Sequence, residues 1–137
     1  MFDLRKIENA RINVPEPEML APTASETFKE GEALYISSGK ATKASGTNKP
    51  THICMESYVA PSTGARKIAT YRITPEMLFE VPVDFSSSPV ALVEGSKVTV
   101  GSDGLSVTDV TTSGVVTIVD TLEADNTDGD KILIRIE

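Results

Sequence analysis

The chain has 137 residues, enough for one domain, or one domain with an arm, and for a core that needs neither metal nor disulfide. Its 20 acidic and 13 basic residues give a formal charge of −7, which disfavours a phosphate backbone and therefore nucleic acid as a partner. Only 5% of the residues are aromatic and none is tryptophan, so we expect an aliphatic core.

The first 27 residues differ in pattern from the rest. Prolines at positions 15, 17 and 22 fix the backbone and push their neighbours toward extended geometry, so we expect an extended N-terminal arm over residues 1–27. Within it, Ile12 and Val14 alternate with polar residues at the period of a strand. The alternative is an arm that folds back along its own body as an edge strand.

A β-rich body is predicted over residues 28–137. Glycines 31, 39 and 46 separate two short strand patterns, and a turn leads into the next pattern at 52–60. The segment 67–73 alternates as a strand does. The run 77–83 also indicates extended structure, and Pro82 within it indicates an edge position or a bulge.

The strand pattern is clearest after Pro89. An Asp103-Gly104 turn joins two halves of a hairpin, and two more strand patterns follow at 115–122 and 131–136. Such closely spaced strands predict an all-β fold, a small β-barrel or sandwich of short antiparallel strands. The segment 84–90 could link two sub-lobes, 28–84 and 90–137. We identify no internal repeat.

Candidate reactive groups do not form a complete constellation. His52 and Cys54 are the single histidine and the single cysteine, too few for a zinc site or a conventional triad. Ser37 to Lys40 matches S-x-x-K, but the other β-lactamase elements are missing. The acidic loop lacks two EF-hand carboxylates, although weak cation binding at 123–130 stays open. We expect no metal, no cofactor and no enzymatic activity.

The N-terminus has no apolar signal-peptide segment. No window approaches the ~18 apolar residues that a membrane span requires. We therefore expect a protein that is made in the cytoplasm and does not enter a membrane.

Three segments together resemble the head decoration, or capsid cement, proteins of tailed bacteriophages: the leader ENARINVPEPEML, the block from Phe28 to Ile73, and the β-rich end. The resemblance covers most of residues 8–84. It implies a structural protein on the outer surface of the virion head that binds the expanded major-capsid lattice and stabilises it. It also implies a homo-oligomer, with a trimer favoured, that is made in the host cytoplasm.

On this interpretation the arm is the candidate capsid-binding segment. It could add as a strand to an exposed capsid edge, with Ile12 and Val14 in pockets. Arg5, Lys6 and Arg11 could then meet acidic patches of the shell. The alternatives are another phage structural subunit, such as a head fibre base or a tail tube, and a non-catalytic ligand-binding β module.

Overall fold

The computed structural model describes residues 1–8, 15–122 and 124–137. All regular secondary structure in these ranges is β-strand, which confirms the predicted all-β class. Turns interrupt the apolar pattern every few residues, so the strands are short. In chain order they are β1 Asp3–Ile7, β2 Glu18–Leu20, β3 Thr27–Phe28, β4 Ala33–Ser37, β5 Lys40–Lys43, β6 His52–Cys54, β7 Tyr58–Val59, β8 Ile68–Arg72, β9 Met77–Asp84, β10 Lys97–Val98, β11 Val107–Thr108, β12 Val116–Asp120 and β13 Lys131–Arg135.

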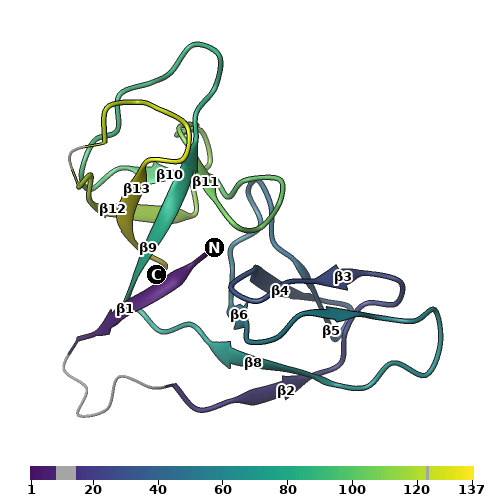
Figure 1. The fold of residues 1–137 in the computed structure, drawn as a ribbon. Coiled ribbons are helices and arrows are strands. Elements are labelled where there is room, and N and C mark those ends of the chain that lie inside the picture. Colours follow the sequence, from purple (N-terminus) through teal and green to yellow (C-terminus); the bar gives the residue numbers. More distant parts are fainter. Residues whose placement is uncertain (9–14, 123) are drawn as a thin grey trace.

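Residues 18–73 form a first lobe around a curled sheet with the strand order β2-β8-β6-β4-β5 (Figure 1). One continuous segment brings the two edges of this sheet together, because β2 pairs with β8 and the residues after β2 pair with β5. Pro22 and Ala41 form a parallel bridge there, and the Ala41 amide donates to the Ala21 carbonyl at 2.8 Å. The short β3–β7 ladder packs against this sheet through Phe28.

Residues 77–137 form a second lobe around another curled sheet, with the order β1-β9-β13-β12-β10. The long strand β9 pairs with β13 on one side and with β1 and then β11 on the other. The β9–β11 ladder is parallel, and a single bridge between Val100 and Val107 links β11 to the residues after β10. These last contacts are one or two residues long, so the sheet is strongly curled and does not form a closed barrel.

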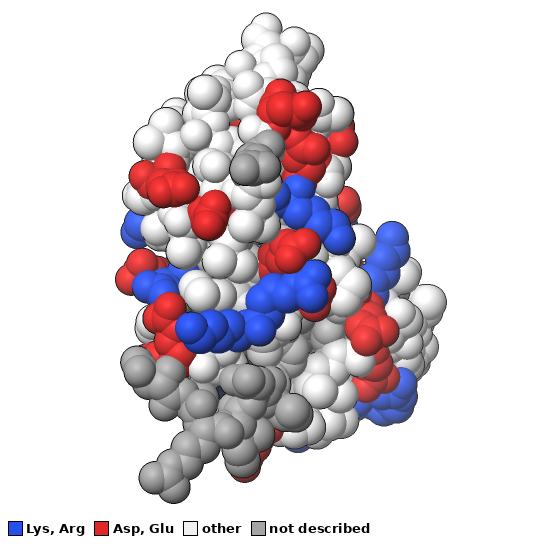
Figure 2. All heavy atoms as spheres, turned by 60° about the vertical axis from the view of Figure 1, so that its left-hand side comes forward, with Lys and Arg blue, Asp and Glu red and all other residues white. Residues whose placement is uncertain are grey.

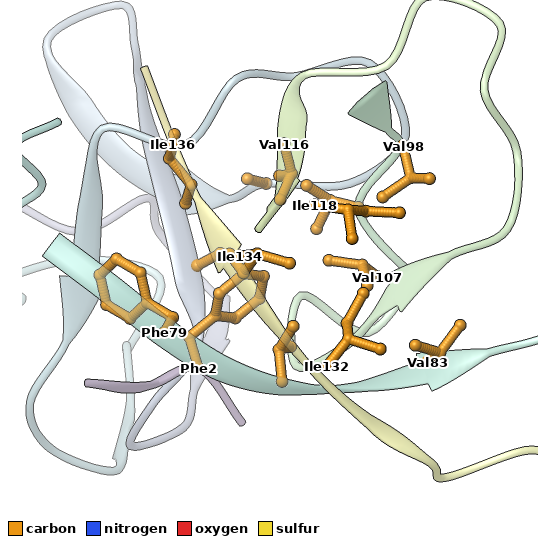
Figure 3. Close-up of a cluster of buried hydrophobic side chains, with 14 of the residues drawn as sticks. Phe2, Phe79, Val83, Val98, Val107, Val116, Ile118, Ile132, Ile134 and Ile136 are labelled. Atoms are coloured by element: carbon orange, nitrogen blue, oxygen red, sulfur yellow. The ribbon is translucent and has the colours of Figure 1, made fainter. Parts of the chain in front are cut away.

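The main hydrophobic core fills the second lobe and extends between the lobes. Ile132, Ile134 and Ile136 enter it from one side of their segment, as the two-residue strand period predicts (Figure 3). Phe2 is buried and packs edge-on against Phe79, with 6.2 Å between the ring centroids. The first lobe adds four members to the same cluster: Ala33, Ala44, Ile53 and Tyr71. The two lobes therefore share this core, and the first lobe also has a smaller core cluster of its own around Phe28 and Ile68.

The two lobes have the same strand topology. Apart from β1, the main sheet of each lobe has five strands, which can be numbered one to five in chain order. In both lobes strand one pairs with strand five, five with four, four with two, and two with three. Strand three then returns to strand one in parallel. These strands are β2, β4, β5, β6 and β8 in the first lobe, and β9 to β13 in the second. The chain therefore contains two copies of one small fold, an internal repeat that we did not identify from the sequence.

Backbone hydrogen bonds repeat residue for residue between the lobes. The Gly31 amide donates to the Cys54 carbonyl, and the Gly95 amide to the Ile118 carbonyl, both at 2.8 Å. Both glycines have positive φ, 80° and 85°, a region that glycine enters without strain. Gly31 precedes Gly95 by the same number of positions as Cys54 precedes Ile118. The same turn is therefore fixed at the same place in each lobe.

The described parts of the N-terminal segment belong to the two sheets and do not form a separate arm. β1 pairs with β9, and β2 pairs with β8. Phe2 fixes β1 in place, because burying a phenylalanine stabilises a fold by roughly 1.5–3 kcal/mol. Residues 1–8 therefore take the alternative arrangement, in which the segment packs along its own body.

The division between the lobes falls at the turn over 74–76, earlier than the 84–90 segment suggested from the sequence. β9 belongs to the second lobe because it pairs with β13. Pro82 therefore lies in a central strand, and not at the edge position or bulge that the sequence predicted. It is accommodated because it falls between the part of β9 that pairs with β1 and the part that pairs with β11.

Candidate interaction surfaces

Two of the five arm residues predicted to bind a partner lie on β1. Arg5 is half-exposed and bound within the molecule, since its Nε lies 3.0 Å from Glu80 Oε2 and a terminal nitrogen lies 3.1 Å from Asp3 Oδ2. Lys6 is exposed, opposite Leu78 in the β1–β9 register. The other three, Arg11, Ile12 and Val14, lie outside the described residues.

The loop between β9 and β10 projects from the second lobe at the top of Figure 1. Its residues Phe85–Val93, which we call the apolar loop, include no charged side chain in a chain that is 24% charged. Val90 and Val93 are 52% and 61% exposed. The tip of the same end is white in Figure 2, and acidic side chains lie just below it. Exposed apolar surface that gathers in one place is typical of a contact site.

Asp109, which follows β11, fixes the apolar loop through hydrogen bonds. Its carboxylate is buried and accepts hydrogen bonds from the Val90 amide at 2.8 Å, the Ser86 hydroxyl at 3.0 Å and the Ser86 amide at 3.2 Å. Burial alone would raise the pKa of Asp109, but these hydrogen bonds outweigh it and the pKa is lowered. The loop is therefore tied at two points, which reduces the entropy lost when a partner covers it.

Glu32 is a second buried carboxyl, at the seam between the lobes. It lies beside Gly104 of the second lobe, whose carbonyl accepts the Ala33 amide at 2.8 Å. Glu32 is 2% exposed, and its buried Oε1 has no hydrogen-bond partner within the described ranges. Burial raises the pKa of Glu32 to about 7, against the opposing effect of Lys43. Burying such a group costs more when it is ionised than when it is neutral, so the seam is more stable with Glu32 protonated.

His52 and Cys54 lie side by side on β6 and make contacts within the first lobe. The His52 Nε2 lies 3.2 Å from a carboxylate oxygen of Glu18. Arg72 binds the same carboxylate with two hydrogen bonds, which are the main cause of the lowered pKa of Glu18. The Cys54 thiol is buried, and burial raises its pKa. The histidine therefore joins β6 to the β2–β8 pair.

Two carboxylates of the acidic loop, residues 124–130, accept backbone amides, one carboxylate from the loop itself and the other from the segment after β9. Asp130 Oδ2 accepts the Asp125 and Thr127 amides, and Asp128 Oδ1 accepts the Phe85 amide at 2.7 Å. Within the described parts of the chain, no three or more histidine, cysteine or acidic side chains gather as metal ligands would. The same ranges contain no helix with the length and apolarity of a membrane span.

No protein-family model, curated protein or solved structure matches this chain.

Our sequence analysis did not identify the apolar loop or Asp109. It interpreted 84–90 as a linker, although the lack of charge over 85–93 was a usable signal. The role of Asp109 could not be read from the sequence, because it depends on β11 lying beside the start of a loop some twenty residues earlier.

Proposed function

We propose that this protein is a phage capsid decoration protein, a non-catalytic structural protein that binds the outer surface of the expanded major-capsid lattice and stabilises the head. The shell as partner comes from the sequence resemblance. The observation that supports a protein contact is the apolar loop, which presents two exposed valines in a fixed conformation on an acidic chain.

The stabilising mechanism is linkage. A protein that binds the assembled, expanded shell and not its precursor stabilises that state by RT ln(1 + [L]/Kd) per site, about 2.7 kcal/mol at a hundredfold excess over Kd. Burying Val90 and Val93 supplies roughly 1.5–3 kcal/mol each, a modest amount for a single copy. Repetition over the many equivalent sites of a shell makes the total large.

The N-terminal segment remains part of the proposal as a second contact. Arg11, Ile12 and Val14 supply the charge and the apolar alternation for strand addition to a capsid edge. Arg5 and Lys6 lie next to them in sequence, on β1. Deleting residues 1–14 would also remove Phe2 from the core. Substitutions within 11–14 therefore test the contact more cleanly than a truncation does.

The test is co-sedimentation of the full chain with empty phage heads, expanded and unexpanded. The wild type is expected to sediment with expanded heads and to raise their melting temperature. Val93→Glu should weaken binding by about tenfold or more, because it places a charge in an apolar contact. The matched control is Val59→Glu, since Val59 is an exposed valine on β7 of the first lobe. Combined Arg11→Glu, Ile12→Asp and Val14→Asp substitutions test the N-terminal contact separately.

Expanded heads that ignore the wild type at saturating concentration would refute the capsid role. Equal effects of Val93→Glu and Val59→Glu would refute the apolar loop as the contact. Electron microscopy of the purified protein tests the tail-tube alternative, because a tail-tube subunit stacks into hollow tubes by itself, whereas a decoration protein or a ligand-binding module does not.

A further inference from the structure

The two lobes contact each other through different surfaces. The first lobe contributes the start of β4 and the residues after β5, and the second contributes the hairpin between β10 and β11. Gly46 and Val100 form an antiparallel bridge, with amide-to-carbonyl distances of 2.8 and 3.0 Å. The Ala33 amide donates to the Gly104 carbonyl at 2.8 Å. A contact between different faces of two copies of one fold is heterologous, and it leaves one face of each kind unused.

The unused hairpin is in the first lobe. Ile36 pairs with Ala41 as Val100 pairs with Val107, so Ile36 is the counterpart of Val100. Val100 is 2% exposed at the seam, whereas Ile36 is 40% exposed. All residues of Ile36–Lys40, which we call the free hairpin, are exposed. An apolar residue that the fold buries in one lobe therefore faces solvent in the other.

A pair of glycines shows the same contrast. Gly39 and Gly104 each lie in the turn of their lobe's hairpin, with φ of 76° and 69°, although the turn from Ile36 to Ala41 is shorter than the turn from Val100 to Val107. A Cβ added to Gly104 would lie 2.7 Å from Lys43 Cγ and 3.0 Å from Glu32 Cγ, both side chains of the first lobe. A Cβ added to Gly39 would meet nothing within 4 Å. The space over the free hairpin is open where the equivalent space at the seam is filled.

The complementary unused surface is in the second lobe. Ala33 and Ala44 are buried at the seam, and strand register makes Lys97 and Val110 their counterparts. Lys97 is exposed and Val110 is 46% exposed. The backbone leaves the shared pattern here, because the Val110 amide donates to Thr108 Oγ1. We call Lys97 and Val110 the free face. These residues correspond in position to Ala33 and Ala44 at the seam, but their backbone hydrogen bonds are not all the same.

We propose that a second copy of this chain docks its free hairpin on the free face, repeating the contact that already joins the two lobes. The intramolecular seam is the template, and the new contact continues it in the same direction. Ile36 of one copy becomes buried against Val110 of the next, as Val100 is buried at the seam. Such head-to-tail contacts close into a ring or extend into a filament, according to the rotation at each step. This self-association does not depend on the capsid role.

Analytical ultracentrifugation of the full chain tests the proposal. The mean mass of the wild type is expected to rise with concentration. Ile36→Asp and Val110→Asp should each weaken self-association by about tenfold or more, because each places a charge in the apolar contact. Val59→Asp, which alters an exposed valine outside both surfaces, should associate as the wild type does. Circular dichroism confirms that each variant is folded, and Ser37→Arg replaces Ile36→Asp if that variant is not.

Mixing the two variants tests the head-to-tail geometry. Ile36→Asp keeps an intact free face, and Val110→Asp keeps an intact free hairpin, so an equimolar mixture should form a one-to-one dimer and nothing larger. A wild type that remains monomeric up to about 1 mM overturns the proposal, because an apolar contact like the seam is expected to bind more tightly than that. Variants that associate as well as the wild type, or a mixture that stays monomeric, overturn it equally.

Discussion

Asp109 and Glu32 are each 2% exposed, yet their pKa values move in opposite directions. Burial opposes ionisation of both carboxyls. Asp109 receives three hydrogen bonds from Ser86 and Val90, which stabilise its charge. Glu32 keeps an oxygen without a partner, so burial decides its pKa. At the scale of single residues, the available donors determine which buried carboxyl is ionised at neutral pH.

Glu32 should make stability depend on pH. Its pKa of about 7 in the folded state lies above the ordinary value of 4.5, so the folded state binds the proton more tightly. The free energy of unfolding should therefore be highest below about pH 4.5. It should fall as the pH rises from there to about 7, by up to about 3 kcal/mol in total. Glu32→Gln should remove this slope and be more stable than the wild type at pH 8 by about 1–3 kcal/mol.

Urea denaturation of both proteins at pH 5, 6.5 and 8 measures this effect. Glu30→Gln is the matched control, because Glu30 is an exposed neighbour two positions away. A Glu32→Gln variant that keeps the wild-type slope would show that another group carries the pH dependence.

The free hairpin of the first lobe and the seam hairpin of the second each have a glycine in their turn, so the same glycine-to-alanine substitution can be compared in an open and in a packed environment. Gly39→Ala and Gly104→Ala meet the same positive φ, which costs roughly 1–2 kcal/mol in each case. Gly104→Ala also forces a Cβ against Glu32 and Lys43, so it should cost about 1–3 kcal/mol more. Chemical denaturation gives both values. Gly39→Ala should further reduce self-association, which Gly104→Ala should leave unchanged. Equal losses of stability would contradict the packing difference between the two hairpins.

The apolar loop depends on one side chain of a neighbouring element. Asp109→Asn removes the charge that accepts the Ser86 and Val90 hydrogen bonds and should cost about 1.5–3 kcal/mol. The pKa of Asp109 is lowered, so its ionised carboxylate stabilises the fold at pH values above the ordinary pKa of aspartate. This stabilisation is lost as the pH falls through the lowered pKa. Hydrogen exchange should become faster over residues 86–93. Asp84→Asn, at an exposed position at the end of β9, is the control and should leave the exchange unchanged.

Local pattern was sufficient to predict most strands. The alternation at 131–136 became β13, and the glycines at 39 and 46 bracket β5 as expected. Pro82 misled the prediction, because β1 and β11 divide one side of β9 between them and leave a gap at the proline. Pairing partners distant in sequence decide this, and no local pattern reports them.

The repeat was hidden because its two copies share backbone geometry more than residue identity. Glu30-Gly31 and Glu94-Gly95 occupy the same turn, and Lys67-Ile68 and Lys131-Ile132 lie at equivalent positions where β8 and β13 begin. Their equal spacing was a usable signal in the sequence. Some counterparts differ in chemical type where one lobe is covered and the other is exposed, as with buried Ala33 and exposed Lys97.

The whole molecule should unfold as one unit, because the first lobe supplies Ala33, Ala44, Ile53 and Tyr71 to a core centred in the second. All three tyrosines, at positions 35, 58 and 71, lie in first-lobe strands and the chain has no tryptophan, so tyrosine fluorescence reports the first lobe and, through Tyr35 and Tyr71, its contact with the shared core. Far-ultraviolet circular dichroism reports both lobes. Ile134→Ala, in the second lobe, should cost about 2–5 kcal/mol and shift both signals to the same lower midpoint. A tyrosine transition that stays at the wild-type midpoint would mean that the lobes unfold independently and that the shared core does not couple them.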